Sequence, residues 1–171
     1  PASAIYKVYH MCNRKHKDFY VIDIISDLLS NGKSARLYKS LVQEQKIFSE
    51  INAYVSGEIE DGLFVISGNI MPEFTVEKAN ESIIIELQKI TENLVEDYEL
   101  QKVKNKIEST IIFSETNILN KAMNLAKFAH IGNIDLINNE IDLYLQVTKN
   151  EIQTVAKNLF KEQNESNLFY I

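Results

Sequence analysis

The chain has 171 residues, of which 45% are hydrophobic and 25% charged, so it is long enough for one domain with a substantial core. Its net charge is −6 and it lacks a basic stripe interleaved with aromatic residues, which argues against a nucleic-acid-binding protein. The single cysteine, Cys12, excludes a disulfide framework, and no apolar run approaches the roughly 20 residues that a membrane-spanning helix needs.

The N-terminal part of the sequence predicts a strand followed by two helices. Residues 4–11 (AIYKVYHM) are rich in aromatic and β-branched side chains and predict a strand. Residues 16–30 carry apolar side chains at helical spacing and end at Asn31-Gly32, which favours a helix stop. Ser34 is placed to cap a second helix, whose apolar stripe is Leu37, Tyr38, Leu41 and Val42.

The hydrophobic period then changes from helical to alternating, which predicts a pair of strands over residues 47–56 and 63–70. A turn signal at residues 60–62 lies between them and favours an antiparallel hairpin. For the first strand we expect alternate residues to be buried. The set expected on the buried face is Ile47, Ser49, Ile51, Ala53 and Val55, and the set on the outer face is Phe48, Glu50, Asn52, Tyr54 and Ser56.

The second half of the chain is helical in pattern. Thr75 is placed to cap a helix that follows it, and residues 96–161 carry further apolar stripes at helical spacing. Thr148 and Glu151 have the spacing of a capping box, and residues 167–171 (NLFYI) predict a terminal strand. The sequence therefore predicts an α+β fold in which a mostly antiparallel sheet packs against helices on one face, with residues 1–171 as a single domain.

Few side chains combine into a catalytic pattern. The sequence contains neither an H-x-x-E-H nor an H-E-x-x-H zinc motif and no G-x-S-x-G nucleophile elbow. His10, Cys12 and His16 are the one cluster with metal-ligand chemistry, and they would make a three-ligand zinc site only if the chain folded back after the first strand. The alternative is a strand end with scattered polar residues.

The ordered set of segments resembles one family. Asp18-Phe19-Tyr20, the segment LLSNGKSARLYKSLVQEQKIFSEINAYV and the strand GLFVISGN together resemble the C-terminal half-domain of insulinase/pitrilysin-type zinc metallopeptidases, which include relatives of the mitochondrial processing peptidase. The resemblance covers essentially the whole chain, and Ala35-Arg36-Leu37 matches the helix start of the family.

The resemblance implies a division of labour between two similar halves. The N-terminal half carries the H-x-x-E-H motif and the zinc ion for metal-assisted hydrolysis, and the C-terminal half carries no zinc. We therefore expect this chain to hold no cofactor, to lack catalytic and metal-binding residues, and to pair with a catalytic half-domain of the same or another chain. Its expected task is to close a chamber and help to hold an unfolded peptide, for example by strand addition to a sheet edge.

The chain also departs from the family pattern. Where many relatives have a Gly, a small residue and a Tyr at the start of the first hairpin strand, this chain has Lys46, Phe48 and Ser49. The residues that we predict to contact substrate are Arg36, Ser49 and Tyr54. The alternative role of Arg36 is to anchor its helix through backbone or carboxylate hydrogen bonds.

Two further expectations follow from the resemblance. Because the chain begins at Pro1 rather than Met, we expect it to be part of a longer protein, in either the cytoplasm or the envelope of a bacterium. The alternative function is that of an interaction subunit from a family member that has lost proteolytic activity.

Overall fold

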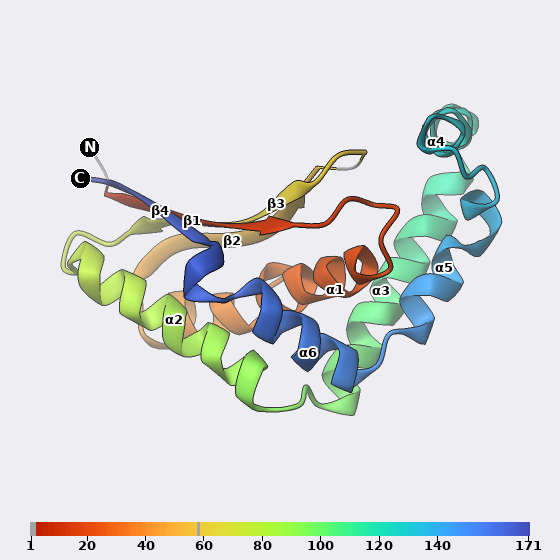
Figure 1. Ribbon diagram of the computed structural model, residues 1–171. Helices are drawn as coiled ribbons and strands as arrows, with labels where there is room; N and C mark the ends of the chain where they lie inside the picture. Colours follow the sequence, from red (N-terminus) through yellow and green to blue (C-terminus); the bar gives the residue numbers. More distant parts are fainter. Residues whose placement is uncertain (1–2, 58) are drawn as a thin grey trace.

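Four strands form one sheet in the computed structural model, which describes residues 3–57 and 59–171 (Figure 1). The strands are β1 (Ala4–Met11), β2 (Phe48–Ser56), β3 (Gly62–Ile70) and β4 (Glu165–Tyr170). Their order across the sheet is β2-β3-β1-β4, and all three neighbouring pairs are antiparallel. The N-terminal strand therefore lies in the middle of the sheet and pairs with the last strand of the chain.

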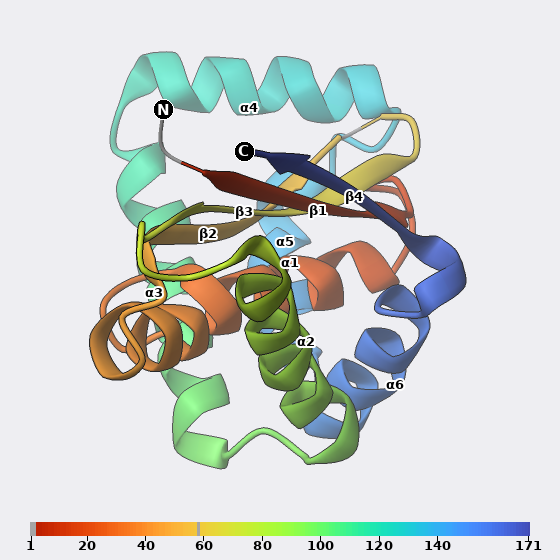
Figure 2. The same ribbon diagram turned by 90° about the vertical axis from the view of Figure 1, so that its left-hand side faces the viewer.

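Three helices cover one face of this sheet and the others extend beyond it. The covering helices are α1 (Asp18–Ser30), α2 (Val76–Glu92) and α6 (Lys149–Leu159). The remaining helical elements are α3 (Asp97–Glu115), α4 (Ile118–Ile131), α5 (Leu136–Gln146), the π-helix Tyr38–Glu44 and the 3₁₀ turn Glu162–Asn164. Figure 2 shows α4 on the opposite side of the sheet from α1, α2 and α6. The predicted α+β fold, an antiparallel sheet packed against helices on one face, is confirmed, and α4 on the other side contacts α3 and α5.

The main core lies between the sheet and α1, α2 and α6. Helix α1 buries nine of its 13 residues, because it lies between the sheet and the other helices. Two predicted caps are present and fix where the neighbouring helices begin. The Thr75 hydroxyl accepts from the backbone N–H of Lys78 at the start of α2, and Thr148 and Glu151 form a capping box at the start of α6.

The segment between α1 and β2 is a π-helix, Tyr38–Glu44, rather than the α-helix that the sequence predicts. Ser34 does not cap this helix, because the N-cap residue is Leu37 and no side chain caps it, and the Ser34 hydroxyl instead accepts a hydrogen bond from the Lys102 ammonium group. Lys46 follows the π-helix with a φ of +54°, the left-handed conformation that glycine adopts most easily. The sequence does not predict the wider helical turn, because the spacing of the apolar residues fits an α-helix as well as a π-helix.

A buried ion pair attaches β4 to the sheet. The Lys7 side chain on β1 is 0% exposed, and its ammonium group lies 2.5 Å from the Glu165 carboxylate. The Tyr9 hydroxyl donates to the same carboxylate at 2.8 Å, and the Asn167 side chain donates to it at 2.5 Å. All three donors converge on one edge-strand residue, so the pairing of β4 depends on polar contacts as well as on its backbone.

Candidate functional site

The face of the sheet that α1, α2 and α6 leave open carries large exposed side chains. Residues directly opposite each other in neighbouring strands point to the same face. Tyr6 lies opposite Ser67 and Leu168, and Ser67 lies opposite Asn52, so these side chains share the open face. The same register adds the exposed hydrophobic residues Tyr54, Leu63 and Tyr170.

This open face was only partly visible in the sequence. Tyr54 was predicted to point outward, but Tyr6, Leu63, Leu168 and Tyr170 were not identified as surface residues. The available signal was the period of two in each strand, which assigns alternate residues to opposite faces. The period does not say which of the two faces is uncovered. That depends on where the helices pack, which the sequence of a single strand does not reveal.

A β-bulge at the start of β2 corrects the predicted faces of two residues. Phe48 is opposite Ile70 and Glu50 is opposite Asn69, so Ser49 is an extra residue between two ladder pairs. Phe48 is buried in the core and Ser49 is exposed, the reverse of the strict alternation that the sequence predicts. The Ser49 hydroxyl donates to the carbonyl of Asn69 at 3.3 Å.

Arg36 forms a two-point contact with an acidic residue of α3. Its Nε and Nη2 atoms donate to the two oxygens of the Glu99 carboxylate at 2.7 and 2.6 Å. The carboxylate raises the pKa of the guanidinium above its ordinary value against the opposing effect of burial. This geometry is the helix-anchoring alternative named above. The contact of Arg36 with substrate stays a prediction.

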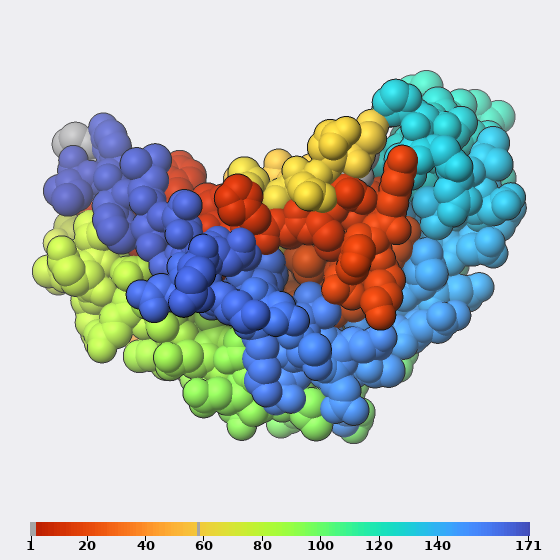
Figure 3. All heavy atoms as spheres, viewed as in Figure 1, coloured from red at the N-terminus to blue at the C-terminus, as the bar shows by residue number. Residues whose placement is uncertain are grey.

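Helix α4 extends the open side of the molecule. Its first half exposes Ile118, Leu119 and Met123, and the preceding end of α3 exposes Ile112 and Phe113. The second half of α4 is held by a separate small core of Phe128, Ile131 and Leu136. In the space-filling view the outline is hollowed between the blue C-terminal strand and the cyan α4 (Figure 3). The open face of the sheet and the first half of α4 thus border one concave side.

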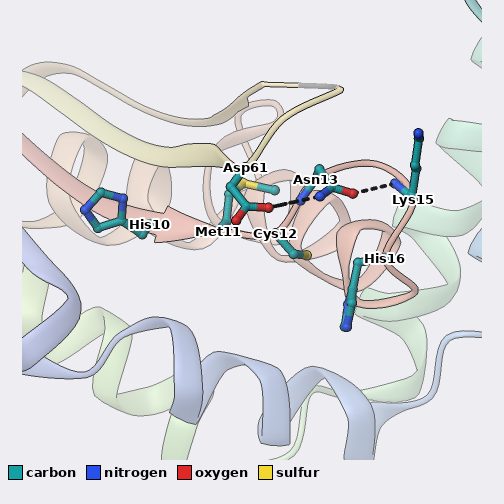
Figure 4. A pocket seen from close by; sticks show the side chains of 7 residues that line it. All are labelled: His10, Met11, Cys12, Asn13, Lys15, His16 and Asp61. Carbon is teal, nitrogen blue, oxygen red and sulfur yellow. Dashed lines mark hydrogen bonds between the residues drawn. The ribbon is translucent and has the colours of Figure 1, made fainter. Parts of the chain in front are cut away.

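The structure does not bring His10, Cys12 and His16 together as metal ligands. Figure 4 shows the three side chains along a shallow pocket after β1, pointing in different directions. Nδ1 of His16 accepts from the backbone N–H of Asp18, and burial followed by the negative charge of Asp18 raises the pKa of the Cys12 thiol. Across residues 3–57 and 59–171, no group of three His, Cys, Asp or Glu side chains is placed to hold a metal ion.

The described part of the chain also contains no helix that is both long enough and apolar enough to cross a lipid bilayer.

A four-stranded antiparallel sheet with helices on one face and an open second face is the architecture that the family resemblance leads us to expect. The family described as "Peptidase M16 inactive domain" matches residues 1–107, and the chain belongs to this family. The family assignment confirms the resemblance that the sequence shows to zinc metallopeptidases.

Known proteins agree with this assignment. The chain is 25% identical over 158 residues to the zinc protease PqqE of Helicobacter pylori, a match that covers 91% of this chain and 35% of that protein. The chain therefore spans about a third of the length of this curated relative. A crystal structure of a protease from Helicobacter pylori superposes with a TM-score of 0.92 at 21% identity, over 98% of this chain and 41% of the other.

A second solved structure has nearly the same extent as this chain. It is an inactive peptidase domain from Bordetella parapertussis, with a TM-score of 0.90 and 19% identity, and the match covers 100% of this chain and 93% of the other. At this identity the comparison establishes the fold alone.

Proposed function

We propose that this chain is the non-catalytic half of a zinc-dependent endopeptidase and forms one wall of a chamber that holds unfolded peptide. The observation that carries the proposal is the open face of the sheet. One face packs against α1, α2 and α6, whereas the other exposes Tyr6, Tyr54 and Leu168, of which the last is 65% exposed. Exposed apolar residues gathered on one face mark a surface that binds another molecule.

The partner in this proposal is a catalytic half-domain in the same or a second chain. It would carry the zinc ion, its ligands and the general base, because the present sequence has no H-x-x-E-H motif. Exposed apolar residues on the first half of α4, such as Ile118 and Leu119, would contact this partner and become buried. Residues 1–171 would then act as one domain of the closed assembly.

Peptide contact would come from the open face and from a free sheet edge. Ser49 and Tyr54 are both exposed on β2, and we propose them as side chains that touch the peptide backbone or its side chains. At the opposite edge, β4 has no charged residue after Glu165 and exposes Leu168 and Phe169. An uncharged edge strand is suited to accept an extended peptide by strand addition.

The test compares the 171-residue chain alone with the longer protein or complex that contains a catalytic half. We expect the chain alone to bind no stoichiometric zinc and to cleave no unfolded peptide, and the complete protein to cleave in a chelator-sensitive manner. In the complete protein, Tyr54→Ala should lower kcat/KM by about tenfold, since burial of an aromatic side chain is worth on the order of 1–3 kcal/mol.

A matched control is Tyr98→Ala, because Tyr98 is an exposed tyrosine on α3 rather than on the sheet. It should leave kcat/KM unchanged. A tightly bound zinc ion in the isolated chain would overturn the proposal. If this chain binds its partner half but the complete assembly cleaves no peptide, the result would favour the alternative, an interaction subunit without proteolytic activity.

A further inference from the structure

The pairing register arranges the side chains of the open face in rows that cross all four strands. Residues directly opposite each other in neighbouring strands point to the same face, so each chain of paired residues forms one row. From β2 to β4, the first row is Glu50, Asn69, Ala4 and Tyr170. The second row is Asn52, Ser67, Tyr6 and Leu168. Each row therefore joins one edge strand of the sheet to the other.

The two ends of these rows differ in chemistry. The polar end, on β2 and β3, consists of the exposed side chains Glu50, Asn52 and Asn69. The apolar end, on β1 and β4, consists of the exposed side chains Tyr6, Leu168 and Tyr170. The Asn52 amide group donates to Oε1 of Glu50 at 2.8 Å, and this hydrogen bond holds the carboxylate on the open face.

The open face is depleted in charge. Among the strand residues on this face, Glu50 is the only Asp, Glu, Lys or Arg, in a chain of which 25% is charged. The cores of protein interfaces show the same depletion of charged residues. A surface with one carboxylate at its edge attracts a partner that carries a positive charge at the matching position and repels one that carries a negative charge there. The rest of the partner should be uncharged.

The width of the sheet sets the spacing of the groups that such a partner must present. Glu50 and Tyr170 end the same row, on the first and last strands in the order β2-β3-β1-β4. Three strand spacings of about 4.8 Å separate them by about 14 Å. In an extended peptide, residues four positions apart point to the same side and also lie about 14 Å apart. An extended segment that crosses the strands therefore reaches both ends with side chains four positions apart.

We propose that the open face selects extended peptide segments in which a basic residue and a large apolar residue lie four positions apart, an inference that rests on the peptide-holding function proposed above. The basic side chain pairs with Glu50, and the apolar side chain packs on Leu168 and Tyr170. The three residues between them cross β3 and β1, over Asn69 and Ala4. This contact is separate from strand addition at the edge of β4, because the segment runs across the strands.

The experiment titrates the 171-residue chain with short peptides at low salt and follows the amide NMR shifts. The reference peptide is Ser-Lys-Ser-Thr-Ser-Phe-Ser with both termini blocked, and we expect a dissociation constant on the order of 1 mM. Replacing its Lys by Gln should weaken binding by about two- to fivefold, the range of an exposed ion pair, and replacing it by Glu should weaken binding further. The isomer Ser-Ser-Lys-Thr-Phe-Ser-Ser should also bind several-fold more weakly, because it reaches only one end at a time.

Variants of exposed residues test the two ends without disturbing the fold. Glu50→Gln should abolish the preference for Lys over Gln in the peptide and remove the salt dependence of binding. Leu168→Ala should weaken binding of all four peptides by about threefold or more, since it removes apolar contact area. The matched control is Glu92→Gln, because Glu92 is an exposed carboxylate at the end of α2, on the covered side of the sheet. It should leave affinity and preference unchanged.

The outcomes separate this inference from the peptide-holding function. Shifts at Tyr6, Tyr54 and Leu168 without a preference for Lys or for the four-residue spacing would overturn the selection and leave peptide holding intact. A preference for Lys that survives Glu50→Gln would overturn the selection as well. The absence of shifts on the open face with every peptide up to about 10 mM, tenfold above the expected constant, would overturn both.

Discussion

Removing the two partners of the buried ion pair on β1 and β4 should have unequal effects. The Lys7 side chain is 0% exposed, whereas that of Glu165 is 17% exposed and also accepts from Tyr9 and Asn167. Glu165→Ala leaves the Lys7 ammonium buried without its carboxylate. Lys7→Met leaves a carboxylate that keeps two donors and some access to water. We therefore expect Glu165→Ala to be the more destabilising change.

The size of the difference follows from the burial of the two charges. Removing one partner of a buried ion pair costs about 3–5 kcal/mol, because the remaining charge is uncompensated. We assign this cost to Glu165→Ala, which corresponds to a fall in Tm of about 6–20 °C for a domain of this size. For Lys7→Met we expect about 1.5 kcal/mol, the lower end of the cost of one lost hydrogen bond to a charged group.

Urea unfolding followed by circular dichroism measures both values, provided that the m-value is unchanged. The double variant Lys7→Met/Glu165→Ala should be more stable than Glu165→Ala by about 2 kcal/mol, since the buried charge is gone. A cost of Lys7→Met as large as that of Glu165→Ala would contradict the expected burial effect. A double variant no more stable than Glu165→Ala would contradict it as well.

The same pair gives a pH dependence of known sign. Burial raises the pKa of the Glu165 carboxyl, but hydrogen bonds from Lys7, Asn167 and Tyr9 outweigh this effect and the pKa lies below its ordinary value of 4.5. A lowered carboxyl pKa contributes stability that is present above the unfolded value and is lost as pH falls through the folded value. The stability advantage of the wild type over Lys7→Met/Glu165→Ala should therefore shrink below about pH 4.5.

Three more changes test other features by unfolding measurements. Gly68→Ala should cost about 1–3 kcal/mol, because a Cβ atom there would lie 2.7 Å from a ring carbon of Phe48, and Phe48→Leu in the same chain should recover part of the loss. Lys46→Gly should stabilise by about 0.5 kcal/mol and Lys46→Val should destabilise by about 1 kcal/mol, since the φ of +54° strains a β-branched residue most. Arg36→Ala should cost about 1–2 kcal/mol, and a double-mutant cycle with Glu99→Gln should assign most of it to the two-point contact.

The order of elements could be predicted from the sequence because local signals dominate it. Helix caps at Thr75 and Thr148 depend on side chains within four residues, and the strand at residues 4–11 is marked by its own composition. The fold class followed from that order and from the family resemblance.

The details of the candidate site were harder to predict because they depend on distant contacts. The bulge exposes Ser49 and buries Phe48, whose ring lies beside Gly68 on the neighbouring strand, and no pattern in residues 47–56 reveals this contact. The Arg36–Glu99 contact joins residues 63 positions apart. The sequence therefore predicts that Arg36 can bond to a carboxylate, but not which acidic residue supplies it.

The small separate core of Phe128, Ile131 and Leu136 has a consequence for the dynamics of α4. A segment with little buried apolar surface opens locally at a lower free energy than the whole domain unfolds. The amides of α4 should therefore exchange with solvent earlier than those of β1 and β3, and proteases should cut there first. A partner that covers Ile118 and Leu119 would slow this opening. Slower amide exchange in α4 would therefore show that the partner is bound.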